Sequence, residues 1–205
     1  QVPGDVSAAA FLILATLISK GSELIIGNVG LNPTRTGFIE IMKLMGGNIK
    51  TVVNNQKKSS EKIGSIIIKS SKLKGIKVPK HLITSAIDEL PLVFLAGACA
   101  EGSTIIRNAG ELRYKESDRI SSMIKTLNTF AIKTKEFNDG ATIDGGTITG
   151  GIVDSFGDHR IAMTAIIASC VSEQPIIVEN CKNIDTSFPT FQKIMNLIGM
   201  NIKEH

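Results

Sequence analysis

The chain has 205 residues, of which 42% are hydrophobic and 20% are charged, and its formal net charge is +4. This length suits one domain with a sizeable core, and the composition excludes an intrinsically disordered chain. Tryptophan is absent and aromatic residues make up 4% of the chain, so the core must consist mainly of aliphatic side chains.

Three long apolar segments, each followed by a short β-branched segment, divide the chain into similar units. We expect buried helices at 6–19, 90–100 and 160–171, because these segments are apolar on all sides. Each is followed by a strand that ends near an asparagine, at 21–28, 102–108 and 174–180. The repetition predicts a single domain over 1–205 with internal repeats at about 1–75, 76–150 and 151–205.

A second, amphipathic helix is expected after each of these strands, at 34–45, 117–128 and 188–197. Two of these helices end at glycine, the usual C-terminal stop, whereas the middle one leads into Ala131 instead. Further strands are expected at 65–69 and 141–144. The fold class is therefore predicted to be α/β, with three repeated βαβαββ-type units, buried helices inside and sheets outside.

Lysines outnumber acidic residues between Lys50 and Lys80, which raises the alternative of a nucleic-acid-binding surface. No aromatic residue is interleaved there to stack on bases, and arginine is lacking. We therefore favour a solvated hairpin and expect no nucleic-acid partner.

The three cysteines, Cys99, Cys170 and Cys181, lie in apolar runs and form no C-x-x-C pair. This pattern predicts buried thiols in a reducing compartment, with a cytoplasmic location, and neither a metal site nor a cysteine nucleophile. No segment reaches the roughly 18 apolar residues of a membrane helix, so no membrane partner is expected. The first residue is Gln1 rather than methionine, which leads us to expect that the chain is part of a longer protein.

Charged residues gather where the predicted buried helices begin. Asp5 and Ser7 are expected to cap the first helix. Asp88 and Glu89 precede the second, where Pro91 suits the first turn. The third begins with Asp158, His159 and Arg160, and because an arginine is unfavourable at a helix N-terminus, this choice indicates an anion-binding position.

The densest cluster of charge is the run Arg113–Arg119, which has five charged residues and precedes an apolar helical pattern. Glu116 and Arg119, and likewise Lys115 and Asp118, are three residues apart and are expected to share a helix face. Taken alone, this favours two surface ion pairs. If the helix starts of related units converge, however, one edge of the domain collects a mixed set of charges suited to anion binding and proton transfer: Asp88, Lys115, Glu116, Arg119, His159 and Arg160.

Six segments in the same order resemble the C-terminal part of the 5-enolpyruvylshikimate-3-phosphate synthases (3-phosphoshikimate 1-carboxyvinyltransferases). They are Val2-Pro3-Gly4-Asp5-x-Ser7-Ala8-Ala9, Asn32-Pro33-Thr34-Arg35-Thr36-Gly37, Asp88-Glu89-Leu90-Pro91, Lys115-Glu116-Ser117-Asp118-Arg119, Asp158-His159-Arg160-Ile161-Ala162-Met163 and Thr186-Ser187-Phe188-Pro189. A sister family, the UDP-N-acetylglucosamine enolpyruvyl transferases, shares the fold but not the pattern at 115–119.

The resemblance implies an enolpyruvyl transferase inside-out barrel domain, one of two similar domains with the substrates in the cleft between them. It implies transfer of the enolpyruvyl group from phosphoenolpyruvate to the 5-hydroxyl of shikimate 3-phosphate, with release of phosphate and with no metal or organic cofactor. The partner would be the N-terminal domain of the same enzyme. The resemblance also implies that the whole enzyme is a monomer and a target of glyphosate. We expect the isolated chain to be inactive. The alternatives are a catalytically silent domain and half of the sister transferase.

Residue roles carry over by matching positions. Asp88 matches the carboxylate that contacts the 5-hydroxyl and is a candidate base, and Glu116 matches the proposed proton donor to the methylene carbon of phosphoenolpyruvate. Lys115 matches a residue near the reacting centre and the phosphate-bearing substrate. Arg119 and Arg160 match anion clamps, with His159 beside them. Thr186 departs from the family, in which many members carry lysine at this position. A glyphosate-tolerant branch carries the Thr-Ser-Phe-Pro found here, but the sequence leaves open whether this protein is tolerant.

Overall fold

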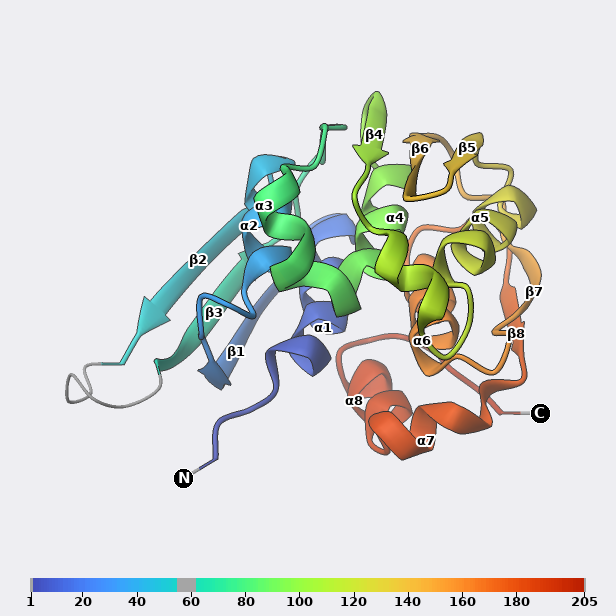
Figure 1. The fold of residues 1–205 in the computed structure, drawn as a ribbon. Helices are drawn as coiled ribbons and strands as arrows, with labels where there is room; N and C mark the ends of the chain where they lie inside the picture. Colours follow the sequence, from blue (N-terminus) through green and yellow to red (C-terminus); the bar gives the residue numbers. More distant parts are fainter. Residues whose placement is uncertain (1, 55–61, 205) are drawn as a thin grey trace.

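The computed structural model describes residues 2–54 and 62–204. Three helices, α1 (Val6–Ile18), α4 (Leu90–Ala98) and α6 (His159–Ala168), contact one another at the centre of the fold. Figure 1 shows three small sheets arranged around the outside of these helices. Every residue of α4 is buried, as are most of those in α1 and α6. The predicted α/β class, with buried helices inside and sheets outside, is confirmed.

The first unit consists of α1, β1 (Glu23–Gly30), α2 (Gly37–Leu44), β2 (Asn48–Val53) and β3 (Ile63–Lys69). Strand β3 is central and pairs antiparallel with both β1 and β2. Ile66 and Ile68 of β3 are completely buried, which fits a strand with one face on the core. The predicted helix at 34–45 is shorter at its N-terminus, because residues 32–35 form a turn in which the Asn32 side chain accepts a hydrogen bond from the Thr34 N–H and its backbone carbonyl accepts one from the Arg35 N–H.

The second unit consists of α3 (Lys80–Ile83), a 3₁₀ segment η1 (Thr84–Glu89), α4, β4 (Ser103–Ile106), a 3₁₀ segment η2 (Gly110–Tyr114), α5 (Arg119–Thr129), β5 (Thr134–Phe137) and β6 (Gly140–Asp144). Its sheet repeats the first, because β6 is central and antiparallel to β4 and β5. Helix α5 begins at Arg119 rather than at 117, because the Asp118 side chain accepts a hydrogen bond from the backbone N–H of Ser121.

The third unit consists of β7 (Gly151–Asp154), α6, β8 (Ile176–Glu179), a 3₁₀ segment η3 (Cys181–Asn183), α7 (Ile184–Ser187) and α8 (Phe191–Leu197). Strands β7 and β8 are parallel and form a sheet of two strands. Within the described residues this unit lacks the closing antiparallel pair of strands, so it departs from the predicted βαβαββ pattern. The exact repeat boundaries, at about 75 and 150, stay predictions.

Two backbone features recur at matching places in the units. Asn28 lies near the end of β1, and Asn108 and Asn180 lie just after β4 and β8; all three have left-handed backbones, with φ of 57°, 61° and 60°. Asparagine adopts this conformation more readily than other non-glycine residues. The three amphipathic helices also end alike, with a left-handed residue at Gly46, Ala131 and Gly199.

These helix ends share one hydrogen-bonding pattern. In each, the backbone N–H of the third residue beyond the helix donates to a carbonyl five residues back, as for Gly47 to Met42, Ile132 to Leu127 and Met200 to Met195. This is the Schellman motif, which requires a left-handed residue that is usually glycine. The glycine stops at Gly46 and Gly199 are confirmed, and Ala131 adopts the same conformation without being glycine.

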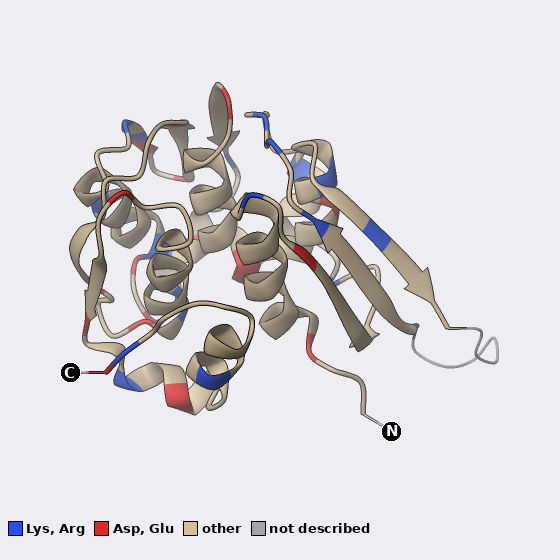
Figure 2. Cartoon of the chain, turned by 180° about the vertical axis from the view of Figure 1, so that it is seen from behind, with Lys and Arg blue, Asp and Glu red and all other residues tan. Residues whose placement is uncertain are grey.

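The lysine-rich stretch includes β2, β3 and the segment after them. Among its described residues, Lys50, Lys62, Lys69, Lys72, Lys74, Lys77 and Lys80 are all exposed, while Lys57 and Lys58 lie outside the described residues. Figure 2 shows Lys and Arg positions, coloured blue, along the strands of this sheet, away from the buried helices. This arrangement agrees with the solvated hairpin that the sequence favoured.

The continuous helical run Lys80–Ala98, formed by α3, η1 and α4, is the one part of the described chain that is long and apolar enough to cross a membrane. In the sequence this run does not stand out as continuously apolar, because Asp88 and Glu89 interrupt the hydrophobic residues. In the fold, 67% of its most apolar window is buried. Core helices of globular proteins meet the same length and composition criteria, and we interpret this run as a core helix.

Candidate functional site

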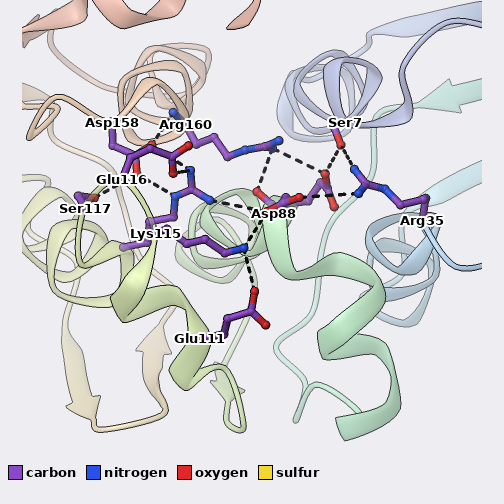
Figure 3. A network of polar contacts seen from close by, with 11 residues as sticks. Ser7, Arg35, Asp88, Glu111, Lys115, Glu116, Ser117, Asp158 and Arg160 are labelled. Carbon is purple, nitrogen blue, oxygen red and sulfur yellow. Dashed lines mark hydrogen bonds and ion pairs between the residues drawn. The ribbon is translucent and has the colours of Figure 1, made fainter.

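The N-terminal ends of the three buried helices meet at Asp88, the penultimate residue of η1 (Figure 3). The Asp88 side chain is 26% exposed and faces three cations. Its carboxylate oxygens lie 3.5 Å from the Nζ of Lys115, 3.8 Å from a guanidinium nitrogen of Arg119 and 3.8 Å from one of Arg35. Arg35 comes from the segment before α2, and Lys115 and Arg119 come from the run 113–119. The predicted convergence of Asp88 with Lys115 and Arg119 is present in the structure.

Asp88 and Glu89 differ from the expected helix start. The helical run continues through η1 into α4, so the helix has no free end at these residues, and the Glu89 side chain makes no capping hydrogen bond. The acidic pair therefore directly precedes α4, which begins at Leu90 as expected, but it does not cap that helix. By contrast, Asp5 and Asp158 do cap α1 and α6, as expected, and Pro91 lies in the first turn of α4.

Arg119 is held from two sides at the start of α5. Its Nε donates to Asp158 at 2.8 Å, and one terminal nitrogen donates to Glu116. The arginine side chain is 1% exposed and that of Asp158 is 0% exposed. Burial by itself raises the pKa of Asp158, but Arg119, the backbone N–H of Arg160 and Ser117 together hold that pKa below its ordinary value. The pair is therefore ionised at neutral pH and fixes the arginine beneath Asp88.

Lys115 extends toward Asp88 from the segment between η2 and α5. Its Nζ also lies 2.8 Å from Glu111, and this hydrogen bond raises the pKa of Lys115 despite partial burial, with a further contribution from the charge of Asp88. The expected pairing of Lys115 with Asp118 is wrong. Because α5 begins only at Arg119, Lys115 precedes the helix, and Asp118 instead pairs with Arg113 at 2.6 Å.

Glu116 and His159 lie at the open side of this cluster. Glu116 forms the expected pair with Arg119, although it precedes the helix, and its side chain is 51% exposed. His159 is the first residue of α6 and is half-buried. Burial and then the charge of Arg160 lower the pKa of His159, so the imidazole is mainly neutral at pH 7.

Arg160 contacts the second unit rather than lying over its own helix start. One guanidinium nitrogen donates to the backbone carbonyl of Asp88 at 3.0 Å and lies 3.7 Å from Glu89. Arg160 is therefore near Asp88 without pairing to its side chain. Its backbone N–H donates to Asp158, so both ends of this arginine are tied to acidic residues of the cluster.

Five further residues belong to the cluster and were absent from the predicted site: Ser7, Arg35, Glu89, Glu111 and Asp158. Ser7 was expected to help cap α1, but its hydroxyl donates to Glu89 and accepts from Arg35. One of these residues, Arg35, could have been found from its sequence context. Arg35 lies in the Asn32–Gly37 segment without an acidic neighbour, which indicates that its partner is distant in sequence.

Other residues singled out from the sequence lie elsewhere. Thr186 is exposed on α7, and its hydroxyl donates to the carbonyl of Asn183 at 2.8 Å. His81 is exposed, and His205 lies outside the described residues. Within the described part of the chain, no group of three or more His, Cys, Asp or Glu side chains is arranged to hold a metal ion.

The cysteines lie away from the charged cluster. All three are unpaired and partly buried. Burial raises the pKa of Cys99 to about 12, with a smaller contribution from Cys170, and burial also raises the pKa of Cys170 and Cys181. Cys99 lines a cavity of about 380 Å³ at the C-terminal ends of the buried helices, together with Ile18 and Val171. Thiols with such pKa values are poor nucleophiles.

The chemical capacity of the cluster follows from its composition. Four cationic side chains, Arg35, Lys115, Arg119 and Arg160, surround or adjoin Asp88, and the partly exposed Glu116 lies on the far side of Arg119. Fixed guanidinium groups bind phosphate and carboxylate groups well. Two separate carboxylates can serve as a proton acceptor and a proton donor. The arrangement suits a reaction of a small anionic substrate that moves protons.

Comparisons with known proteins agree on one family. A family model described as EPSP synthase (3-phosphoshikimate 1-carboxyvinyltransferase) matches residues 1–195. The 3-phosphoshikimate 1-carboxyvinyltransferase of Legionella pneumophila strain Corby is 47% identical over 205 residues, which are 100% of this chain and 47% of the relative. That of Coxiella burnetii strain RSA 331 is 43% identical over 203 residues, or 99% of this chain and 46% of the relative. The chain thus spans about half the length of these relatives.

Solved structures give the same result for the fold. The EPSP synthase of Acinetobacter baumannii superposes with a TM-score of 0.95 and 42% identity, covering 99% of this chain and 47% of the other. The enolpyruvyl transferase NikO from Streptomyces tendae has a TM-score of 0.75 at 17% identity, covering 98% of this chain and 44% of the other. The second likeness concerns the fold alone, and it agrees with the predicted enolpyruvyl transferase architecture.

Proposed function

Because the chain belongs to the EPSP synthase family, we propose that it is one part of a 3-phosphoshikimate 1-carboxyvinyltransferase. The whole enzyme would transfer the enolpyruvyl group of phosphoenolpyruvate to the 5-hydroxyl of shikimate 3-phosphate and release phosphate. This reaction belongs to the shikimate pathway of aromatic amino acid biosynthesis. The observation that carries the proposal is Asp88, a partly exposed carboxylate that faces Lys115, Arg35 and Arg119 at 3.5 to 3.8 Å.

Asp88 is the proposed base. In the addition step the 5-hydroxyl oxygen bonds to the central carbon of phosphoenolpyruvate, and Asp88 accepts the hydroxyl proton. Its position at the open meeting point of three helix ends allows a substrate hydroxyl to approach, while the cations around it stabilise the negative charge of the substrate.

Glu116 is the proposed acid. The methylene carbon of phosphoenolpyruvate gains a proton in the addition step and loses one when phosphate departs, so a single carboxyl group can deliver and then recover it. Glu116 is half exposed and is oriented by Arg119. A carboxyl group held in this way is accessible to substrate and has a fixed direction.

The cations have separate proposed roles. Lys115 contacts the reacting centre beside Asp88, and Arg119 and Arg160 hold the carboxylate and phosphate groups of phosphoenolpyruvate. His159, which is mainly neutral, adds hydrogen bonding next to Arg160. No metal or organic cofactor is assigned to this reaction. The short polar side chain of Thr186 does not supply the cation that many family members carry there, so the arginines of the cluster supply the positive charge.

The proposed partner is the N-terminal domain of the same enzyme, which would form the second wall of the substrate cleft. We propose a cytoplasmic monomer, with no membrane or nucleic-acid partner. The chain alone contains the candidate acid and base but, by the family resemblance, few of the contacts to shikimate 3-phosphate. We therefore expect negligible turnover by the chain alone.

A phosphate-release assay tests this function. With both substrates, the chain supplemented with its N-terminal domain should release phosphate, and the chain alone should not. The absence of turnover when both folded parts are present would instead favour a catalytically silent domain that binds phosphoenolpyruvate weakly. Turnover with UDP-N-acetylglucosamine in place of shikimate 3-phosphate would identify the sister transferase.

A further inference from the structure

Five residues form a closed ring of polar contacts next to the proposed base. A guanidinium nitrogen of Arg35 lies 3.8 Å from the Asp88 carboxylate, and another donates to the Ser7 hydroxyl at 2.9 Å. The Ser7 hydroxyl donates to Glu89, and Glu89 lies 3.7 Å from Arg160. Arg160 then donates to the backbone carbonyl of Asp88 and closes the ring (Figure 3).

Glu89 is the innermost member of this ring. Its side chain is 3% exposed, whereas those of Arg160 and Arg35 are 15% and 50% exposed. The Ser7 hydroxyl accepts a hydrogen bond from Arg35, so its own proton is directed to Glu89. One buried Glu89 oxygen therefore orients Ser7, which holds Arg35, and the same oxygen also lies 3.7 Å from Arg160.

Such a buried carboxylate needs a reason, because burying a charged group is costly. A purely structural role would be to connect α1 with α4 through Ser7. That role would not require the second contact, to Arg160 on α6, or the continuation through Ser7 to the exposed Arg35. Both arginines have long side chains that lose considerable rotamer entropy when they are fixed. A fixed anion beside them reduces the number of orientations that they sample.

We propose that Glu89 is a positioning residue, which holds the guanidinium group of Arg160 directly and that of Arg35 through Ser7, so that both remain beside Asp88. Glu89 does not contact substrate. It acts on the orientation of the two cations, and its consequence for turnover rests on the function proposed above. Arg35 thereby becomes part of the site, although its segment is distant from the other charged segments in the sequence.

The geometry predicts separable effects for two substitutions. Glu89→Gln removes the negative charge opposite Arg160, while the amide oxygen can still accept the hydrogen bond from Ser7. Ser7→Ala removes the hydroxyl that holds Arg35 and leaves the contact between Glu89 and Arg160 in place. Glu40→Gln serves as the matched control, because Glu40 pairs with Lys43 on the exposed face of α2.

Nuclear magnetic resonance of the arginine side chains in the chain itself reads out these effects. The measured quantity is the rate of rotation about the Cζ–Nε bond of each guanidinium group. We expect Glu89→Gln to speed rotation of Arg160 at least about ten-fold with little change at Arg35, and Ser7→Ala to do the reverse. Glu40→Gln should change neither rate. The proposal is overturned if the rotation rates of both arginines are unchanged in both variants. If Glu89→Gln does not fold, unchanged rates in Ser7→Ala alone overturn it.

Turnover of the enzyme completed with its N-terminal domain gives the second measurement. Misplaced cations should lower kcat/KM by about 100-fold in Glu89→Gln and by a smaller factor in Ser7→Ala, with Glu40→Gln at the parent value. If the completed parent has no activity, the proposed function fails while the rotation rates still decide the positioning role. If the parent is active and both variants match it, the positioning role is rejected.

Discussion

The Nε of Arg119 lies 2.8 Å from the Oδ2 of Asp158, and the two side chains are 1% and 0% exposed. Asp158 also accepts hydrogen bonds from the backbone N–H of Arg160 and from the Ser117 hydroxyl. This carboxylate therefore joins the start of α5 to the start of α6 and holds Arg119 in place under Asp88. A single buried residue combines a helix cap, an ion pair and the support of a proposed substrate contact.

Replacing Asp158 with asparagine should lower the free energy of unfolding by about 3 kcal/mol, because it removes the fully buried carboxylate that compensates the charge of the buried Arg119. Urea unfolding of the chain measures this loss. Glu23→Gln is the control, since Glu23 pairs with Lys69 and both side chains are 54% exposed; it should change the stability little. Equal losses of unfolding free energy in the two variants would show that the buried pair stabilises the fold no more than an exposed pair does.

Glu89 predicts a pH dependence of stability. Burial raises the pKa of Glu89 above its ordinary 4.5, and the hydrogen bond from Ser7 and the charges of Arg160 and Arg35 offset this only in part. Since the folded chain binds this proton more tightly than the unfolded chain, the contribution of Glu89 to stability falls as pH rises from about 4.5 through the folded-state pKa. Glu89→Gln lacks this titration.

Urea unfolding at several pH values between 4 and 7 measures this effect. The free energy of unfolding of Glu89→Gln, minus that of the parent, should become more positive as pH rises. A difference that stays constant, or that becomes more negative with rising pH, would mean that the pKa of Glu89 is not raised in the folded chain.

Glu116→Gln should reduce kcat of the completed enzyme by at least about 100-fold, because a carboxamide cannot deliver a proton to carbon. The Glu116 side chain is half exposed, so urea unfolding of the variant chain should stay close to that of the parent. A variant that mainly loses stability while keeping its turnover would return Glu116 to the role of a surface ion-pair partner.

The apolar pattern of the sequence was sufficient to predict the three buried helices and the flanking amphipathic ones. Their burial depends on hydrophobic periodicity, which is local and readable. The boundaries were less accurate where side chains redirect the backbone, as at Asp118, which moves the start of α5 to Arg119. That shift is also why Lys115 faces Asp88 instead of Asp118.

The site could be predicted only in part, because some of its contacts join residues that are far apart in the sequence. Asp88, Lys115, Glu116, Arg119 and Arg160 belong to dense charged motifs and meet as expected. Ser7 and Glu89, by contrast, are 82 residues apart, and their contact depends on how α1 packs on α4. No local pattern distinguishes a serine that caps its own helix from one that contacts another helix. The family resemblance assigned roles to residues, but the ring around Asp88 required the tertiary structure.

Ala131 offers a test of the repeated helix end. It has φ of 62° at the position where Gly46 and Gly199 stand in the other units. A left-handed backbone costs an alanine about 1 kcal/mol more than a glycine, so Ala131→Gly should raise the free energy of unfolding. The gain should be somewhat smaller than that amount, because glycine also makes the unfolded chain more flexible and thereby stabilises it. The reciprocal Gly46→Ala should lower it. Thermal or urea unfolding measures both, and a loss of stability in Ala131→Gly would contradict this account.

The central claim is that this chain supplies the acid, the base and the anion-binding cations of an enolpyruvyl transferase whose cleft needs a second domain. The most direct test is phosphate release from phosphoenolpyruvate and shikimate 3-phosphate, measured for the chain, for its N-terminal domain and for the two together. We expect release by the mixture and none by either part, with Asp88→Asn in the mixture close to background. Release by the chain alone, or undiminished release by the Asp88→Asn mixture, would contradict the claim.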